Sequence, residues 1–234
     1  MSQLRQAAVS STGDSQKFSP ITWAEYVSVV IELTVTAYQK MYQDSCVIKR
    51  SLEENSFTLN LEDYIRPIAF NREQSIFVHS RKKQHTPEMK LGRQPTIAAK
   101  EMDLFLHGSW EANYDKIHFV WEAKLVGDKQ NYSTLSSEYV NEAIYRFINM
   151  GYGANVPDGG VLGYVLSGNV PDLVMDINQS MGRLRKNNPL PASNHLQIAA
   201  PVHQFDAIYR STHTRTDSSL IQLHHLFLTF EFVE

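Results

Sequence analysis

Cysteine is almost absent from this sequence, in which Cys46 is the only one. A single thiol cannot form an intramolecular disulfide, so the fold does not depend on an oxidising compartment. Long apolar runs are missing too, since none approaches the roughly 20 residues that a helix needs to cross a bilayer. These absences exclude a disulfide-stapled scaffold and a membrane-spanning protein, and we expect a cytoplasmic protein with no membrane partner.

An excess of charge of either sign is also missing. Lysine and arginine together number 22, and aspartate and glutamate number 25, which leaves a formal net charge of −3. The chain as a whole has no electrostatic attraction to phosphate, so any surface that binds nucleic acid must be local. The sequence also contains no helix-turn-helix, zinc finger or Walker loop, which are motifs that would indicate a substrate directly.

The composition is that of one globular domain. The 234 residues are 42% hydrophobic and 20% charged, which suffices to bury one substantial core. Residues 1–20 are rich in Ser, Gln and Thr and lack the apolar stretch of a secretory signal. We therefore expect a mobile leader at 1–20 and a single domain at 21–234.

Apolar periodicity predicts a mixed α/β fold. Trp23, Val30 and Ala37 recur at helical spacing, and a second helix begins near Ser51 and is expected to end before Pro67. The expected helices are 21–42, 51–65, 132–150 and 170–181, and the expected strands are 75–79, 97–107, 117–126, 160–167, 205–211 and 220–233. The predicted fold class is a single α/β domain whose mixed central sheet is flanked by helices.

Two acids and a lysine lie on the two strands of a predicted hairpin. Asp103 lies on the first strand, and Glu122 and Lys124 lie on the second. Side chains alternate along a strand, so Glu122 and Lys124 point to the same face. Neighbouring strands are about 4.8 Å apart, which lets Asp103 project beside them. A Glu-x-Lys pair is also common on solvent-facing strands, but here an apolar segment precedes it and a helix follows it.

These residue types suit metal-dependent hydrolysis of a phosphodiester. Two close carboxylates repel each other and raise one pKa, a conflict that a divalent cation removes. Hard oxygen ligands with room for water favour Mg²⁺ or Mn²⁺. The cation would polarise the phosphate and lower the pKa of a bound water, while the lysine orients that water and offsets developing charge.

At these positions the sequence resembles the PD-(D/E)XK, or restriction-endonuclease-like, nuclease superfamily. The signature of that superfamily is an acid, a gap, and then Glu or Asp, any residue, and Lys. Asp103, Glu122, Ala123 and Lys124 fill those places, with Met102 where the family name has proline. The resemblance implies a restriction-endonuclease-like core and catalytic roles for Asp103, Glu122 and Lys124. It also implies a metal site of Asp103, Glu122 and the carbonyl of Ala123.

The resemblance covers roughly residues 51–167 and implies one more acid. Many members of the superfamily carry a glutamate on the helix before the first core strand, where it reaches the metal or its water. Glu54 is the expected residue and the fourth catalytic candidate. A favourable interaction with the helix dipole explains Glu53 and Glu54 equally well, and Glu25 and Glu32 stay as alternatives.

Basic and aromatic side chains near the motif are candidates for contacts with phosphate, which carry no sequence information. Most lie in predicted loops, including a polar loop expected from 81 to 95, and two lie on the helix after the motif. Solvated loops and ordinary helix packing explain the same patterns. The candidates for nucleic-acid binding are Lys82, Lys83, Arg183, Lys186, Tyr139 and Arg146.

The expected function is therefore that of a nuclease, with DNA as the first substrate and RNA as the alternative. The order of motifs also resembles restriction-like bacterial proteins, which implies defence against foreign DNA by analogy. A second class stays open, a non-catalytic nucleic-acid-binding or assembly subunit that keeps the nuclease fold. An acidic chain without a DNA-reading motif would then depend on a protein partner for targeting, and a homo-oligomer is an open alternative.

Overall fold

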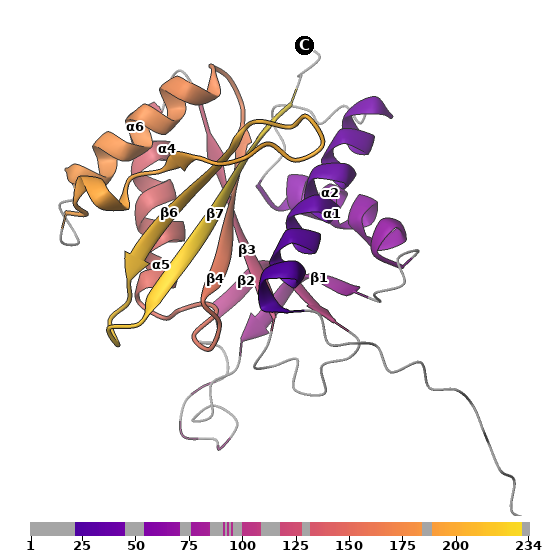
Figure 1. Ribbon diagram of the computed structural model, residues 1–234, viewed down its shortest axis with the longest axis horizontal. Helices are drawn as coiled ribbons and strands as arrows, with labels where there is room; N and C mark the ends of the chain where they lie inside the picture. Colours follow the sequence, from indigo (N-terminus) through magenta and orange to yellow (C-terminus); the bar gives the residue numbers. More distant parts are fainter. Residues whose placement is uncertain are drawn as a thin grey trace, which may run out of the picture.

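The computed structural model describes residues 22–44, 54–70, 76–84, 91, 93, 95, 100–108, 118–127, 132–183 and 189–230. Its centre is one seven-stranded sheet in the order β1-β2-β3-β4-β7-β6-β5 (Figure 1). β3, β4 and β7 run parallel, and the other neighbours are antiparallel. The strands are β1 (Ile76–Gln84), β2 (Lys100–Gly108), β3 (Phe119–Val126), β4 (Asp158–Val165), β5 (Gln197–Ile198), β6 (Ile208–Thr214) and β7 (Leu220–Thr229). The predicted mixed α/β sheet is confirmed, whereas the leader predicted at 1–20 lies outside the described residues.

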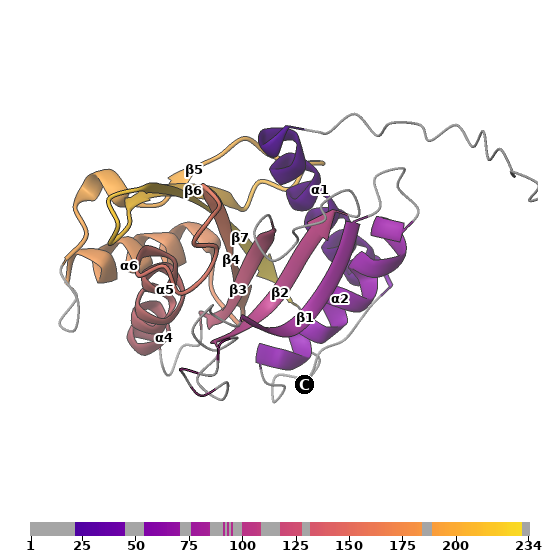
Figure 2. The ribbon, with the colours of Figure 1, turned by 90° about the horizontal axis from the view of Figure 1, so that it is seen from below.

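Helices cover both faces of the sheet (Figure 2). α1 (Trp23–Gln43) and α2 (Glu54–Phe70) lie on one face. The other face carries α4 (Tyr132–Glu138), the π-helix η2 (Tyr139–Ile144), α5 (Tyr145–Ile148) and α6 (Val170–Gly182), and a short 3-10 turn, η3 (Ala192–Asn194), follows. Two hydrophobic cores result, one on each side of the sheet. None of the described helices is long and apolar enough to span a membrane.

The second helix continues beyond the end that the sequence predicts. α2 runs through Pro67 to Phe70. Proline removes one backbone hydrogen bond, but Pro67 is exposed, so water can satisfy the carbonyl group one turn earlier. Ile65 and Ala69 are buried against the sheet and keep the last turn attached. Tertiary packing therefore outweighs the local stop signal.

The first strand is also longer than predicted. Arg81, Lys82 and Lys83 were expected in a loop, but they lie inside β1, which pairs with β2 in antiparallel register. β1 is an edge strand. Charged side chains are common on edge strands, where they discourage pairing with another chain. The basic run at 81–83 therefore belongs to the edge strand of the sheet and not to a loop.

A glycine fixes the distance between β3 and β4. Trp121 on β3 is the register partner of Gly160 on β4, and its indole lies over the glycine. A Cβ at Gly160 would come within 2.1 Å of the Trp121 ring. Because Glu122 follows Trp121, this close packing helps to fix the part of β3 that carries the motif.

Candidate active site

The candidate site lies where β2 stops pairing with β3. Strand pairing ends at Leu104 and Trp121. The same register continued by one residue would place Asp103 opposite Glu122. Both strands extend beyond this point, so the sheet opens locally between them. The backbone donors of β3 that face this opening need other acceptors.

Two carboxylates take the place of the missing strand partner. Asp103 Oδ2 accepts the N–H of Ala123 at 2.7 Å, and Glu54 Oε2 accepts the N–H of Leu125 at 3.2 Å. Alternate N–H groups of a strand point to the same side, so both would otherwise pair with β2. Asp103 and Glu54 therefore satisfy backbone donors, a task that is independent of any catalytic one.

Asp103 lies where β2 loses its regular alternation. Leu104 belongs to the core under α1 and α2, and Met102 belongs to the core on the other face. Residues two apart on a strand normally share a face. On β1, Arg81 lies between the partners of Leu104 and Met102, and its φ of 54° is a left-handed conformation that non-glycine residues rarely adopt. The irregularity accompanies an Asp103 carboxylate directed toward β3.

Glu122 has the least favourable environment for a charge in this cluster. Its side chain is 1% exposed, and its Oε1 lies 2.6 Å from Arg146 Nη1 and 3.2 Å from Lys124 Nζ. Its Oε2 is buried and has no hydrogen-bond partner among the described residues. Burial and then the Asp103 carboxylate raise the pKa of Glu122 to about 8, against the attraction of Lys124 and Arg146. A cation would relieve such an environment.

Lys124 connects β3 to the start of α2. Its ammonium donates to Glu54 Oε1 at 2.9 Å and to the carbonyl of Ala123. Burial opposes the charge on Lys124, but the attraction of Glu122, Glu54 and Asp103 outweighs it and raises the pKa of the ammonium. Burial raises the pKa of Glu54, and Lys124 opposes that shift. Lys124 is therefore a fixed positive charge at neutral pH.

Arg146 reaches the same carboxylate from the other face of the sheet. Its guanidinium donates to Glu122 Oε1 at 2.6 Å, to the Tyr152 hydroxyl at 2.9 Å and to Glu142 Oε2 at 2.9 Å. Tyr152 donates in turn to the carbonyl of Glu101 on β2 at 2.7 Å. The π-helical segment η2 immediately precedes α5, and such segments are frequent at functional sites. Arg146 and Tyr152 together fix the orientation of Glu122.

Glu54, the helix glutamate chosen from the sequence, contacts Lys124, and one unpredicted residue joins the cluster. α2 brings Glu54 to Lys124, whereas Glu25 closes the exposed capping box of α1. Glu53 lies outside the described residues. Tyr152 was not predicted, because no local pattern of the sequence connects its hydroxyl to Arg146. Its position follows from the turn after α5.

The donor set suits a hard divalent cation but does not form a complete protein shell. Asp103 and Glu122 supply carboxylate oxygens, one of them the unpartnered Oε2. Within the described ranges, no group of three or more His, Cys, Asp or Glu is arranged to hold a metal ion. The carbonyl of Ala123, the third predicted ligand, accepts a hydrogen bond from Lys124. Water and phosphate oxygens would have to complete the shell, as is usual for Mg²⁺.

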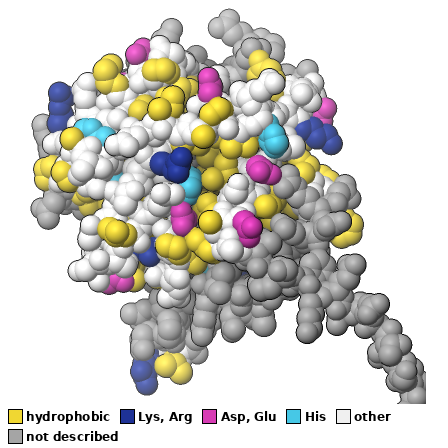
Figure 3. Space-filling view, viewed as in Figure 1, with side chains coloured by type: hydrophobic (Ala, Val, Ile, Leu, Met, Phe, Trp, Pro, Cys, Tyr) yellow, Lys and Arg dark blue, Asp and Glu magenta, His cyan; other side chains and the backbone are white. Residues whose placement is uncertain are grey.

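Apart from Arg146, the predicted basic residues that the structure describes lie on the edge strand β1 or at the end of α6. Lys82 Nζ lies 3.7 Å above the ring of Phe105, and Lys83 is exposed on β1. Arg183 is exposed at the end of α6, and Lys186 lies outside the described residues. On the face seen in Figure 3, basic and acidic side chains are scattered among one another. That view shows no extended basic field.

The prediction that Tyr139 contacts nucleic acid is wrong. Tyr139 is 0% exposed, and its hydroxyl is hydrogen-bonded to His225 Nδ1 at 2.9 Å. His225 Nε2 lies 2.8 Å from Ser211 Oγ, which also contacts His213 Nε2 at 2.7 Å. These four side chains form a second polar cluster, the histidine cluster, between η2, β6 and β7. Helix packing explains Tyr139 without a ligand.

No family model, curated protein or solved structure matches this chain. The resemblance to the PD-(D/E)XK superfamily therefore depends on the motif residues and stays a prediction. The fold and the site define a mixed α/β protein with a partly buried cluster of acids and bases at the end of a central strand.

Proposed function

We propose that this protein is a metal-dependent nuclease that hydrolyses phosphodiester bonds. The observation that supports the proposal best is Glu122, whose buried Oε2 lacks a hydrogen-bond partner among the described residues while burial and the Asp103 carboxylate raise its pKa. A protein that needed only a stable sheet would gain by replacing such a group with an apolar one. A conflict of this kind in a cluster of titratable residues is typical of functional sites.

The roles follow from the contacts. Asp103 and Glu122 would hold Mg²⁺ or Mn²⁺, which when bound supplies polarisation of the phosphate and activation of a water molecule. Lys124 would orient that water and offset charge on the phosphate oxygens. Glu54 would position Lys124 through the 2.9 Å ion pair. Arg146 would hold Glu122 in place, and its remaining donors would be available to a phosphate.

A second candidate function is a binding or assembly subunit that keeps the site without cleavage. Glu122 already contacts two cationic side chains, Lys124 and Arg146. These contacts offset part of its charge without a metal, and Arg146 binds Oε1. In this alternative the cluster stabilises the opening between β2 and β3, and targeting depends on a protein partner.

Cleavage assays separate the two candidates. Wild-type protein is incubated with plasmid, linear duplex DNA, single-stranded DNA and RNA, each with Mg²⁺, Mn²⁺ or chelator. The nuclease proposal expects cleavage of at least one substrate that depends on the metal and disappears in Glu122→Gln. Absence of cleavage of every substrate with either metal, from folded protein, would contradict the proposal and favour the binding subunit.

A further inference from the structure

One face of the β1–β2 hairpin is not covered by a described helix. α2 packs against β1 and β2 on the face of the first core, where Ile76 and Val78 point. On the opposite face the helices α4 and η2 pack over β3 and β4 instead. Figure 2 shows β1 and β2 extending beyond α4, α5 and α6. The side chains on this part of the sheet are therefore candidates for binding.

Aromatic rings occupy this part of the sheet. Phe77 and His79 alternate with the buried residues of β1, and their register partners on β2 are His107 and Phe105. The rings of Phe77 and His107 are stacked at 5.3 Å, and those of His107 and His79 at 5.5 Å with an interplanar angle of 11°. Phe77 is 48% exposed. We call Phe77, His79 and His107 the ring platform; Phe105, the partner of His79, is buried beside it at 1% exposure.

Positive charge accompanies the ring platform. Lys82 Nζ lies 3.7 Å above the centre of the Phe105 ring. The pKa of His79 is lowered by burial and by Lys82, and the pKa of His107 is lowered by burial and by the neighbouring His79 and Lys82. Both imidazoles therefore stay neutral at pH 7 and can stack as aromatic rings. Lysine beside neutral rings suits an anionic ligand that has aromatic faces.

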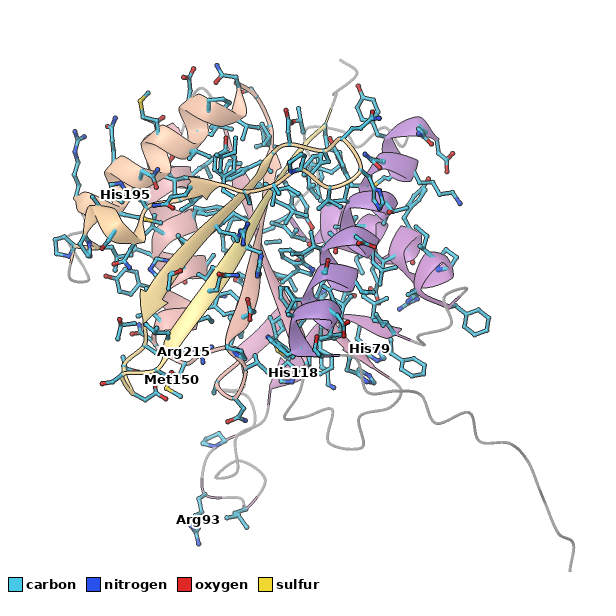
Figure 4. The ribbon with its side chains drawn as sticks, in the orientation of Figure 1. His79, Arg93, His118, Met150, His195 and Arg215 are labelled. Atoms are coloured by element: carbon cyan, nitrogen blue, oxygen red, sulfur yellow. The ribbon has the colours of Figure 1, made fainter. Side chains whose placement is uncertain are left out.

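The ring platform leads directly to the candidate active site. Phe105 lies two residues from Asp103 on β2, which corresponds to about 7 Å along a strand. His118, which precedes β3, contacts Phe105 with ring centroids 4.5 Å apart. Figure 4 labels His79 and His118 at the same end of the sheet. A nucleic-acid strand whose bases stack on the ring platform would therefore bring its neighbouring phosphates toward Asp103.

We propose that the ring platform binds unpaired bases, and that the substrate is single-stranded nucleic acid. Aromatic rings on a sheet bind bases by stacking without sequence preference, and nearby lysines bind the phosphates. A base pair inside a duplex is stacked on both faces by its neighbours and offers no free face to such rings. The catalytic consequence rests on the nuclease function proposed above, whereas binding can be tested without it.

Binding is measured by fluorescence anisotropy in chelator, with labelled single-stranded DNA, single-stranded RNA and duplex DNA. Wild type should bind the single strands more tightly than the duplex. Phe77→Ala should weaken single-strand affinity about fivefold or more, the effect of one stacked base. Phe77→Trp should restore it. Phe70→Ala is the matched control, because Phe70 is 83% exposed on α2, and it should leave affinity unchanged.

His79→Ala provides a second variant, and thermal unfolding confirms that each variant is folded. A preference for the duplex, or equal single-strand affinity of Phe77→Ala, His79→Ala and wild type, would overturn the inference. So would the absence of binding to any nucleic acid, which would point to another occupant, such as a protein. Cleavage of duplex DNA alone would overturn this inference and leave the nuclease proposal intact. Single-strand binding that depends on Phe77, without cleavage of any substrate, would contradict the nuclease proposal and support this inference.

Discussion

Two of the buried polar clusters among the described residues lie on the same sheet and differ in charge. The first, here called the acidic cluster, consists of Asp103, Glu122, Lys124, Glu54 and Arg146. The histidine cluster contains only groups that can be neutral. Burial lowers the pKa of His213 to about 4 and that of His225 well below its usual value. The two histidines of this cluster are therefore neutral at pH 7, and no charge is buried there.

The acidic cluster gives up charge only in part: the raised pKa of Glu122 favours its neutral form at pH 7, whereas the two basic side chains keep their charge. Lys124 and Arg146 stay charged, and Glu122 is held between their attraction and the cost of burial. His213 Nδ1 also lacks a partner among the described residues, but a neutral nitrogen costs less to bury than a carboxylate oxygen. Burial alone therefore does not distinguish the two clusters, whereas the charge that Lys124 and Arg146 retain does. The following experiments test this distinction.

The largest effect is expected from the two carboxylates of the acidic cluster. Asp103→Asn and Glu122→Gln should each lower kcat by about 10³-fold or more, because a metal ion supplies several kcal/mol of transition-state stabilisation. Single-turnover cleavage is the measurement. Ser211→Ala in the histidine cluster is the control and should cleave like wild type. Equal losses in all three variants would indicate a general structural effect instead.

Lys124 should show a smaller effect on turnover and little effect on the metal. Lys124→Gln should reduce kcat by about 10²-fold to 10³-fold, the usual result of removing one group that stabilises transition-state charge. Metal affinity, measured by titration calorimetry, should not weaken, because the lysine is not a ligand. Lys40→Gln in the last turn of α1 is the control. Loss of metal binding in Lys124→Gln would contradict this division of roles.

The histidine cluster should affect stability alone. Ser211→Ala removes the hydroxyl shared by His213 and His225 and leaves both nitrogens without that partner. The free energy of unfolding should fall by about 1–3 kcal/mol, the cost of unsatisfied buried polar groups. Urea unfolding measures it. An unchanged midpoint would show that the cluster does not depend on this hydroxyl.

The two clusters should give opposite dependences of stability on pH. The pKa of Glu122 is raised from 4.5 to about 8 in the fold, so its stabilising contribution is present below about 4.5 and is lost as pH rises toward 8. The pKa of His213 is lowered from 6.5 to about 4, so its contribution is present above 6.5 and is lost as pH falls toward 4.

Urea unfolding of wild type and Glu122→Gln between pH 4 and pH 9 tests the first of these slopes. The advantage of the glutamine variant over wild type should grow from about pH 4.5 to about pH 8. Added Mg²⁺ should reduce this advantage if it binds the carboxylates. A constant difference between the variants at every pH would show that Glu122 titrates alike in the folded and unfolded chains.

The smallest effect is expected from the basic run on β1. The double variant Lys82→Ala and Lys83→Ala should weaken nucleic-acid affinity and lower the slope of log affinity against log salt by about 1 to 2, since each phosphate contact contributes about 0.7 to 0.9. Lys40→Ala is the control. An unchanged slope would assign this run to protection of the sheet edge.

The sequence predicted most of the helices and strands and placed the motif residues on two neighbouring strands. Alternation along β3 places Glu122 and Lys124 on one face of that strand, and the order of strands puts Asp103 on the neighbouring strand, β2. These predictions depend on local periodicity, which is a property of the chain itself. The end of α2 and the extent of β1 were predicted wrongly, because burial of Ala69 and pairing with β2 outweigh local signals.

The side-chain contacts within the candidate site could not be predicted from the sequence, because they join residues that only the tertiary structure brings together. Only the opening between β2 and β3 makes Asp103 and Glu54 acceptors of backbone N–H groups, and only the packing of α5 brings Arg146 to Glu122, where the Tyr152 hydroxyl also accepts from Arg146. Likewise, the sequence presents Tyr139 and Arg146 as equivalent candidates on one helix. Burial on the sheet makes Tyr139 structural and leaves Arg146 in the site, because a residue's environment depends on which distant strand its face meets.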